Sequence, residues 1–292
     1  MMHASILVTY NPNIKELKVL CESLLLQKSN IIIIDNSETP IKEKELSISA
    51  PVKLISLKKN MGIAYAQNIG IKYCFKINTK YISFFDQDSL IEDGFISKMI
   101  NAIELNGFEI VAPAPKDNYT LEPLEALKLN NFGLRKKVNC DKVDKPYSVD
   151  VVISSGTTMI SEVFDKVGMY DERFFIDHVD TEWCLRCKKN GIKIFIIPDI
   201  NMFHCIGMTR KKIGPYTIQV HSPIRCYYQL RNSIFLLRFA HIPKIFAFYE
   251  IFAQIFNRLL LLMVINSKKN YVIFYLQGII DGIFGNVGPK KK

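Results

Sequence analysis

Two carboxylates separated by one residue follow an apolar segment in the first third of the chain. The segment covers residues 81–85, and Asp86-Gln87-Asp88 comes directly after it. Two carboxylates in such a turn can hold a hard divalent cation, Mg²⁺ or Mn²⁺, which can then bind the oxygens of a diphosphate. Acidic residues in a turn are otherwise simply solvated, so the elements around the turn decide between the two interpretations.

These elements predict an α/β fold with a mainly parallel sheet flanked by helices. Short strand-like segments cover residues 4–10, 30–34, 52–57 and 81–85, and apolar residues at helical spacing cover 14–27, 62–77 and 93–105. The four consecutive Ile at 31–34 suit a parallel strand that is covered on both faces. In such a sheet, ligands bind beyond the carboxyl ends of the strands.

Polar residues occupy those strand ends. They are Thr9, Asn11, Asp35, Asn36, Asp86 and Asp88. Further along, residues 113–145 are polar and predict a loop-rich insertion. Strand signals then return at 149–153, 192–197 and 201–204, with a helix at about 181–190.

The basic charge of the chain is confined to its C-terminal quarter. The 292 residues carry a net charge of +10, yet residues 1–215 hold 28 Lys and Arg against 26 Asp and Glu, whereas residues 216–292 hold 10 against 2. We therefore expect a main domain at 1–215 and a separate basic helical region at 216–292. This region is apolar rather than dense in Lys and Arg, which argues against a nucleic-acid-binding protein.

The C-terminal region alternates long apolar and aromatic stretches with single charges. Its longest uncharged runs, 259–267 and 270–280, are shorter than a membrane-spanning helix requires. An interfacial helix that lies on a membrane surface fits better, with basic residues facing anionic head groups. The alternative is a helical subdomain that packs on the catalytic domain or forms a dimer.

The cysteines predict a reduced, cytosolic protein. Seven are present at irregular spacing, and the N-terminus runs directly into a strand-like segment. Cys184 and Cys187 form one C-x-x-C pair, which we expect to pack inside a helix rather than to bind a metal.

Taken in order, the motifs resemble the nucleotide-sugar-binding half of family 2 glycosyltransferases, which have the GT-A fold. They are I-L-V-T-Y-N at 6–11, I-I-D-N-S at 33–37, N-M-G-I-A at 60–64 with N-I-G at 68–70, and F-D-Q-D-S at 85–89. The second half agrees, with S-G-T at 155–157, F-I-D-H-V-D-T-E-W-C-L-R at 175–186, and His204. The resemblance covers roughly residues 4–235, and within the family the chain is most similar to bacterial rhamnosyltransferases.

For the donor, the resemblance implies that Thr9 and Asn11 line the nucleotide pocket and that Asp35 hydrogen-bonds the pyrimidine base. Three further residues would shape the donor site: Asn60, Gly62 and Asn68. Glycine at 62 would let the backbone pass close to a ligand, although a plain helix-start turn explains it equally well.

For the metal, the resemblance implies Asp88 as the principal ligand of Mn²⁺ or Mg²⁺. Asp86 would contact the ribose or the metal, and His204 would be a further ligand. A mixed Asp and His site suits a borderline metal such as Mn²⁺.

For catalysis, the resemblance implies Asp180 as the base. With Arg186 aligned, the second residue of the family's Glu-Asp pair falls on Asp180 and the first on Val179, so the chain departs from the usual pattern and Asp177 is the alternative. An inverting transfer needs a carboxylate within hydrogen-bond reach of the acceptor hydroxyl. At a helix start, Asp180 could also be only a cap.

For the acceptor, the resemblance implies contacts from Glu182 and from Trp183, whose apolar face would lie against a sugar ring. Core packing is the other interpretation of Trp183. Ser155, Gly156 and Thr157 would border the acceptor site or form a plain turn.

The resemblance thus implies a metal-dependent inverting glycosyltransferase, with L-rhamnose from dTDP-L-rhamnose as the best match. The acceptor would be a lipid-linked or growing polysaccharide for O-antigen or capsule, reached by peripheral binding at the cytoplasmic membrane face. A UDP-hexose donor is the alternative within the same fold. An inactive scaffold is disfavoured by the intact acidic motifs.

Overall fold

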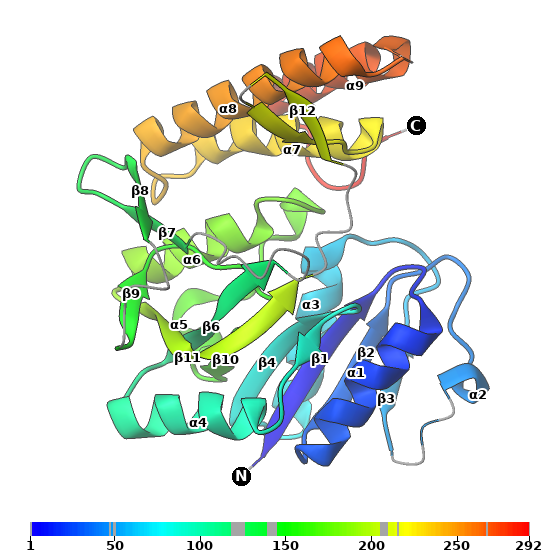
Figure 1. Ribbon diagram of the computed structural model, residues 1–292, viewed down its shortest axis with the longest axis vertical. Helices are drawn as coiled ribbons and strands as arrows, with labels where there is room; N and C mark the ends of the chain where they lie inside the picture. The colour runs from blue at the N-terminus through cyan, green and yellow to red at the C-terminus, as the bar shows by residue number, and fades with distance from the viewer. Residues whose placement is uncertain are drawn as a thin grey trace.

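The computed structural model describes residues 2–46, 48, 51–117, 126–138, 145–204, 210–214, 216–266 and 268–291. Within them a nine-stranded sheet is flanked by helices on both faces (Figure 1). Its strand order is β3-β2-β1-β4-β10-β6-β11-β5, and β9 pairs with β11. The strands are β1 (His3–Thr9), β2 (Asn30–Asp35), β3 (Lys53–Ser56), β4 (Tyr81–Asp86), β5 (Leu90–Ile91), β6 (Ile110–Asp117), β9 (Tyr147–Val149), β10 (Thr158–Ile160) and β11 (Ile194–His204).

Pairing within the sheet is mostly parallel, which confirms the predicted fold class. Parallel ladders join β1 to β2 and β4, β2 to β3, and β6 to β11, whereas β10 runs antiparallel between β4 and β6. The register pairs Thr9 with Asp35 and Val8 with Asp86. It therefore brings the polar ends of three strands to one edge of the sheet.

The run of isoleucines in β2 shows why the sheet is buried on both faces. Side chains alternate along a strand, so Ile32 and Ile34 join one core while Ile31 and Ile33 join the other. The first core includes residues of α3 (Ile63–Lys76) and α6 (Val179–Lys189), and the second includes residues of α1 (Ile14–Leu26) and α4 (Phe95–Asn106). The remaining helices of this part are short: α2 (Glu43–Leu46) and α5 (Val163–Val167).

Four details differ from the sequence prediction. The strand predicted at 149–153 is instead β9, which covers Tyr147–Val149 and ends before residue 150. The described part of the 113–145 insertion contains a hairpin, β7 (Ala126–Leu129) and β8 (Arg135–Val138). The strand β10 carries only three residues, too few for a pattern to reveal. The strands predicted at 192–197 and 201–204 form one strand, β11, with an irregular register between Ile197 and Asn201.

The C-terminal region is a layer of three long helices beyond the carboxyl ends of the central parallel strands (Figure 1). They are α7 (Pro223–Phe235), α8 (Lys244–Val264) and α9 (Lys268–Phe284), and a hairpin of β12 (Arg210–Ile213) and β13 (Tyr216–Gln219) precedes them. Ser222 caps α7, with Pro223 in its first turn. Gly278 lets α9 approach closely, because a Cβ there would lie 2.9 Å from the Tyr227 carbonyl oxygen.

Helix α8 meets the length and composition of a membrane span, and 28% of its most apolar window is buried. The sequence pattern predicts no such helix in this region, because the charged Glu250 and Arg258 interrupt the apolar runs. In the fold both side chains are buried, at 4% and 5% exposure, so the interruptions lie on the inner face of the helix.

Candidate active site

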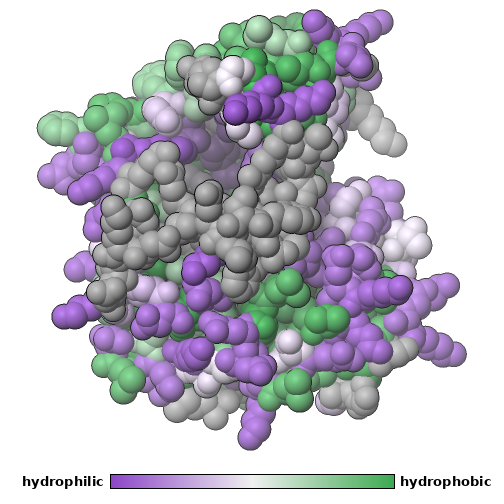
Figure 2. All heavy atoms as spheres, viewed as in Figure 1, coloured by the Kyte–Doolittle hydropathy of each residue, from purple (hydrophilic) through white to green (hydrophobic). Residues whose placement is uncertain are grey.

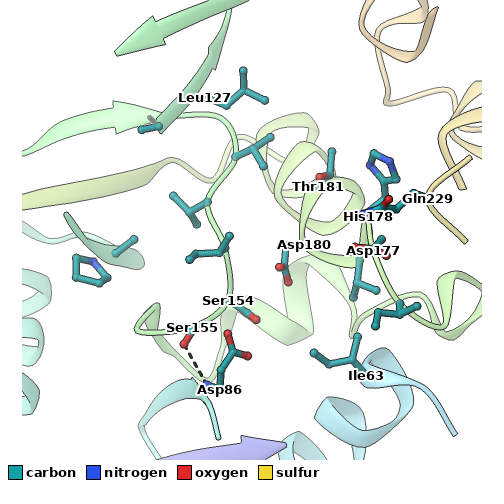
Figure 3. A pocket seen from close by; sticks show the side chains of 18 of the residues that line it. Ile63, Asp86, Leu127, Ser154, Ser155, Asp177, His178, Asp180, Thr181 and Gln229 are labelled. Atoms are coloured by element: carbon teal, nitrogen blue, oxygen red, sulfur yellow. Dashed lines mark hydrogen bonds between the residues drawn. The ribbon is translucent and has the colours of Figure 1, made fainter. Parts of the chain in front are cut away.

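A cavity of about 550 Å³ lies between the carboxyl end of β4, the start of α6 and the C-terminal helices (Figure 3). Segments far apart in the chain supply its polar walls: Asp86, Ser154, Ser155, Asp177, His178, Asp180, Thr181, Arg225, Gln229 and Gln254. Asp86 ends β4, Ser154 and Ser155 lie in the segment before β10, and the last three residues come from α7 and α8. Thus the helical region forms one wall of the cavity.

Asp86 lies at the sheet end of this cavity, with its backbone N–H donating to Ser155 Oγ at 3.0 Å. Loss of hydration raises the pKa of its carboxyl to about 6, with a further contribution from the adjacent carboxylate of Asp88. Two carboxylates that repel each other in this way form a position that a cation would stabilise. The structure therefore brings Asp86 and Asp88 together, as the sequence predicted.

Asp180 faces Asp86 across the cavity, with Ser154 between them (Figure 3). Loss of hydration raises the pKa of Asp180 to about 7, Asp86 raises it further, and hydrogen bonds with Ser154 oppose the rise. The residue is in the first turn of α6. A carboxyl group with a pKa near neutrality is suited to accept a proton from a substrate.

Asp177 has a different environment, because it forms a two-point ion pair with Arg225 of α7. Arg225 Nη2 lies 3.1 Å from Asp177 Oδ1, and Nε lies 3.3 Å from Oδ2. Among the described residues, no cation forms a comparable pair with Asp180. Of the two candidate bases, Asp180 is the one whose carboxylate is not held by an ion pair.

The loop that carries these carboxylates has an unusual backbone. Phe175, Asp177 and His178 have φ of 61°, 60° and 61°, in the left-handed region that is costly for residues with a Cβ. Asn232 of α7, which is fully buried, offsets this cost. Its Nδ2 lies 2.9, 2.7 and 2.9 Å from the carbonyl oxygens of residues 174, 176 and 177.

The helical wall of the cavity carries two carboxamides whose orientation is determined by a buried arginine. Arg258 donates to the side-chain oxygens of both Gln229 and Gln254, the latter at 2.6 Å. Because a guanidinium has only donors, both amide oxygens must turn toward it. The amide nitrogen of Gln254 then remains available to the cavity.

On the predicted nucleotide side, Asp35 is fully buried and its carboxylate accepts four hydrogen bonds. The donors are the hydroxyls of Thr9 and Ser56 and the backbone N–H groups of Ser37 and Ile41. Asn11 is exposed nearby, and its N–H donates to the Ser37 hydroxyl. These residues lie together, although outside the cavity of Figure 3, and Asp35 organises the loop that follows β2.

The other predicted donor residues make contacts within the protein. Asn60 Oδ1 accepts from Asn36 and from the N–H of Gly62. Gly62 has a φ of 89°, and a Cβ there would lie 2.6 Å from the Phe175 carbonyl oxygen. Glycine is thus required at 62 because the 175–178 loop passes too close for a side chain, not because a ligand does.

Asn68 also supports this part of the fold. Its side chain bonds both the N–H and the carbonyl of Tyr170, at 3.0 and 2.9 Å, and donates to Glu172. It is buried and does not line the cavity.

Among the predicted acceptor residues, only Ser155 reaches the cavity. Gly156 and Thr157 hold the turn against β4. The Gly156 N–H donates to the Phe84 carbonyl at 2.7 Å, and the Phe84 N–H donates to the Thr157 carbonyl at 3.2 Å.

The structure does not bring Glu182 or Trp183 to the cavity. Glu182 is paired with Arg186 inside the protein, and the Trp183 ring packs on Phe164 and Tyr170. Glu182 is two residues from Asp180 on α6 and therefore points away from it. Trp183, three residues on, is instead kept from the cavity by its packing in the core, where it is 2% exposed.

Two further predictions concern metal ligands and thiols. The backbone of His204 ends β11, but its side chain lies outside the described part of the structure. Among the residues described, no group of three or more His, Cys, Asp or Glu side chains could hold a metal. Cys184 and Cys187 lie inside α6, and burial raises the pKa of both thiols, so this pair packs as predicted.

Sequence reasoning missed the contribution of α7 and α8 to the cavity. Arg225 and Gln229 are four residues apart on α7, and Gln254 and Arg258 are four apart on α8. This spacing places each pair on one helix face. Nothing in the sequence shows that the two faces meet the loop before α6.

The sequence matches the model of glycosyl transferase family 2 over residues 5–168. It is 39% identical over 286 residues to dTDP-rhamnosyl transferase RfbF of Shigella flexneri, and the alignment covers 97% of this chain and 96% of that protein.

Two solved structures share the fold. Staphylococcus aureus TarS 1–349 in complex with UDP-GlcNAc gives a TM-score of 0.57 at 14% identity, over 96% of this chain and 82% of that one. GalNAc-T7 with UDP, GalNAc and Mn²⁺ gives 0.58 at 14% identity, over 81% of this chain and 47% of that one. With the GT-A architecture and these matches together, the chain belongs to glycosyltransferase family 2 and is similar to a bacterial dTDP-rhamnosyl transferase.

Proposed function

We propose that this protein transfers L-rhamnose from dTDP-L-rhamnose to a hydroxyl group of a glycan, with inversion at the anomeric carbon. The observation that carries the proposal is the position of Asp180, which faces Asp86 across the cavity with a raised pKa. The choice of donor rests on the 39% identity to a dTDP-rhamnosyl transferase.

Asp86 and Asp88 are the residues that would hold a divalent cation, Mn²⁺ or Mg²⁺. Their oxygens suit a hard cation. The pKa of Asp86 is raised first by burial and then by the charge of Asp88, and a bound cation would compensate both effects. When bound, the cation would stabilise the negative charge on the departing diphosphate. GalNAc-T7, which shares the fold, was solved with Mn²⁺. His204 remains a proposed third ligand.

Asp180 acts as the base in this proposal. As the acceptor oxygen forms its bond to the anomeric carbon, the bond from that carbon to the diphosphate oxygen breaks, and the acceptor proton passes to a carboxylate oxygen of Asp180. The product is the glycoside, with dTDP as the leaving group. The ion pair with Arg225 makes Asp177 a weaker candidate.

In this proposal, the donor nucleotide and the acceptor bind at opposite ends of the site. The proposed nucleotide side consists of Thr9, Asn11, Asp35, Asn60, Gly62 and Asn68. On this side, Asp35 and Asn68 act by shaping the loops. The acceptor would enter from the helical side, where Ser155 and the carboxamide of Gln254 line the cavity. Gly156 and Thr157 would support that border, while Glu182 and Trp183 would support α6 from the core.

We further propose that the acceptor is a lipid-linked or growing polysaccharide for O-antigen or capsule, used at the cytoplasmic face of the membrane. The support is that α7 and α8 line one wall of the cavity and that the region containing these helices is basic and has exposed apolar side chains. A UDP-hexose is the competing donor, because TarS, which has the same fold, was solved with UDP-GlcNAc.

Thermal stabilisation by nucleotides is the direct test of the donor site, because a ligand that binds only the folded protein raises its melting temperature. We expect a metal-dependent rise that is largest with dTDP, smaller with UDP and GDP, and absent in Asp88→Ala. A preference for UDP would replace rhamnose with a UDP-hexose. No rise with any nucleotide would contradict the donor assignment, and release of dTDP from dTDP-rhamnose on addition of an acceptor would then test the reaction itself.

A further inference from the structure

Helix α8 has two faces of opposite character. Its inner face carries Glu250, Gln254 and Arg258, which bond to the rest of the protein: Glu250 pairs with Arg135 of β8, and Arg258 binds Gln229 of α7. Its outer face repeats large apolar side chains at intervals of three or four residues, with exposures from 39% to 70%: Ile245, Phe248, Phe252, Ile255, Leu259 and Met263. This face lacks a covering element among the described residues.

Helix α9 continues the exposed apolar surface. Five of its side chains have exposures from 41% to 74%: Ile273, Leu276, Ile280, Ile283 and Phe284. Both α8 and α9 pack on α7. Figure 2 shows hydrophobic residues gathered along the upper edge of the molecule, where Figure 1 places these two helices. Exposed apolar surface on this scale marks an interaction site rather than ordinary surface.

The charges around this surface are of one sign. Residues 216–292 contain ten Lys and Arg but only two acidic residues. Both carboxylates are turned inward, because Glu250 is buried against Arg135 and Asp281 accepts a hydrogen bond from Tyr227 of α7 at 2.7 Å. Three exposed lysines stand at the helix starts: Lys244, Lys268 and Lys269. A surface that is rich in exposed apolar side chains and has lysines at its helix starts is complementary to anionic phospholipid.

We propose that the outer faces of α8 and α9 dock the protein on an anionic membrane surface, with the two helices lying in the plane of the head groups. Helix α8 does not cross the bilayer, since crossing would break the bonds of Glu250 and Arg258 and place both charges in hydrocarbon. This inference deepens the proposed function, because it specifies where the acceptor is met.

The geometry of α8 also sets the distance between membrane and cavity. Gln254 lines the cavity from the inner face, while Phe252 and Leu259 are exposed on the outer face. The cavity wall therefore lies within the width of one helix, about 10–12 Å, from the docked surface. A glycan attached to lipid through a diphosphate would reach the cavity without leaving the membrane.

Vesicle flotation tests the proposal on the full-length protein. We expect it to float with vesicles of phosphatidylcholine and phosphatidylglycerol, and far less with phosphatidylcholine alone. Phe252→Glu combined with Leu259→Glu should abolish flotation. Lys268→Gln with Lys269→Gln should weaken it by about fivefold per lysine. The matched control is Leu26→Glu with Leu105→Glu, two leucines that are 81% and 84% exposed on α1 and α4, and it should float like the wild type.

Nucleotide-induced thermal stabilisation, measured on every variant, separates this proposal from the donor assignment. Retained stabilisation with lost flotation supports membrane docking, whereas flotation that is unchanged in Phe252→Glu with Leu259→Glu overturns it. The proposal is also overturned if the wild-type protein does not float with anionic vesicles. A dimer, detected by light scattering, that dissociates in that variant overturns it as well, because the surface would then bind a second copy of the chain.

Discussion

Asp35 is the last residue of β2 and Asp180 lies in the first turn of α6, and the surroundings of these two carboxylates differ. Asp35 is completely buried and accepts four hydrogen bonds, two of them from backbone N–H groups. Asp180 is half-buried, faces another carboxylate and has a raised pKa. Donors that converge on the Asp35 carboxylate satisfy its oxygens and tie β2 to the loop that follows it, whereas burial and the like charge of Asp86 raise the pKa of Asp180.

The largest expected effect comes from Asp180→Asn, which removes the proposed base. The kcat should fall by about a thousandfold, within the range for loss of a general base, while dTDP still raises the melting temperature. Asp177→Asn is the matched control in the same loop, and we expect a much smaller loss. A larger loss in Asp177→Asn, measured as dTDP release, would transfer the role to Asp177.

A large loss of stability is expected from Asp35→Ala, which leaves buried donors without an acceptor. The free energy of unfolding should fall by about 3 kcal/mol or more, measured by urea denaturation. Ser56→Ala removes a single donor to the same carboxylate and should cost about 1 kcal/mol. Equally small losses of unfolding free energy in the two variants would show that Asp35 does not stabilise the fold and that nucleotide binding is its main role.

A smaller loss of activity is expected from Asn232→Ala, which releases the left-handed loop at 175–178. Without its three carbonyl contacts the loop should sample other conformations, and kcat should fall by about ten- to a hundredfold. Donor binding should change little, since Asp86 and Asp88 are on β4 and its turn. Asn257→Ala, an exposed amide of α8, is the control. An unchanged kcat would mean that the loop keeps its shape without α7.

The pH profile sharpens the same comparison. Asp180 must be ionised to accept a proton, so kcat/KM should rise with pH up to a pKa of about 7 and fall about tenfold per unit below it. A cation held by Asp86 and Asp88, as proposed, would lower this pKa, so the inflection should move to lower pH as the cation concentration rises. A flat profile on the acid side, or one lost in Asp177→Asn but kept in Asp180→Asn, would contradict the assignment.

The smallest effect is expected from Trp183→Phe. The indole N–H donates to the Gly168 carbonyl at 2.9 Å inside the core, so the change should lower stability by about 1–2 kcal/mol. The KM for the acceptor should not change, because the ring does not line the cavity. A clear rise in that KM, with unchanged dTDP binding, would return Trp183 to the acceptor site.

The comparison of Asp86 with Trp183 also shows where sequence reasoning succeeded. Asp86 was placed correctly because a parallel strand ends where its ladder ends, and the polar residue that follows must lie at the sheet edge. The family resemblance assigns Trp183 to the acceptor only because it belongs to the same motif, residues 175–186, as Asp180. However, one residue of helix rotates a side chain by about 100°, so motif neighbours point to different surroundings.

The sequence alone determined the α/β layering, the mainly parallel sheet and the carboxylates at its edge, because apolar periodicity and strand ends are local properties. Tertiary structure alone decided that α7 and α8 form a wall of the cavity, that Asn232 holds the loop of Asp177, and that Glu250 and Arg258 point inward. These features depend on contacts between segments dozens of residues apart, and such contacts are selected by the packing of whole helix faces rather than by the residues next to them.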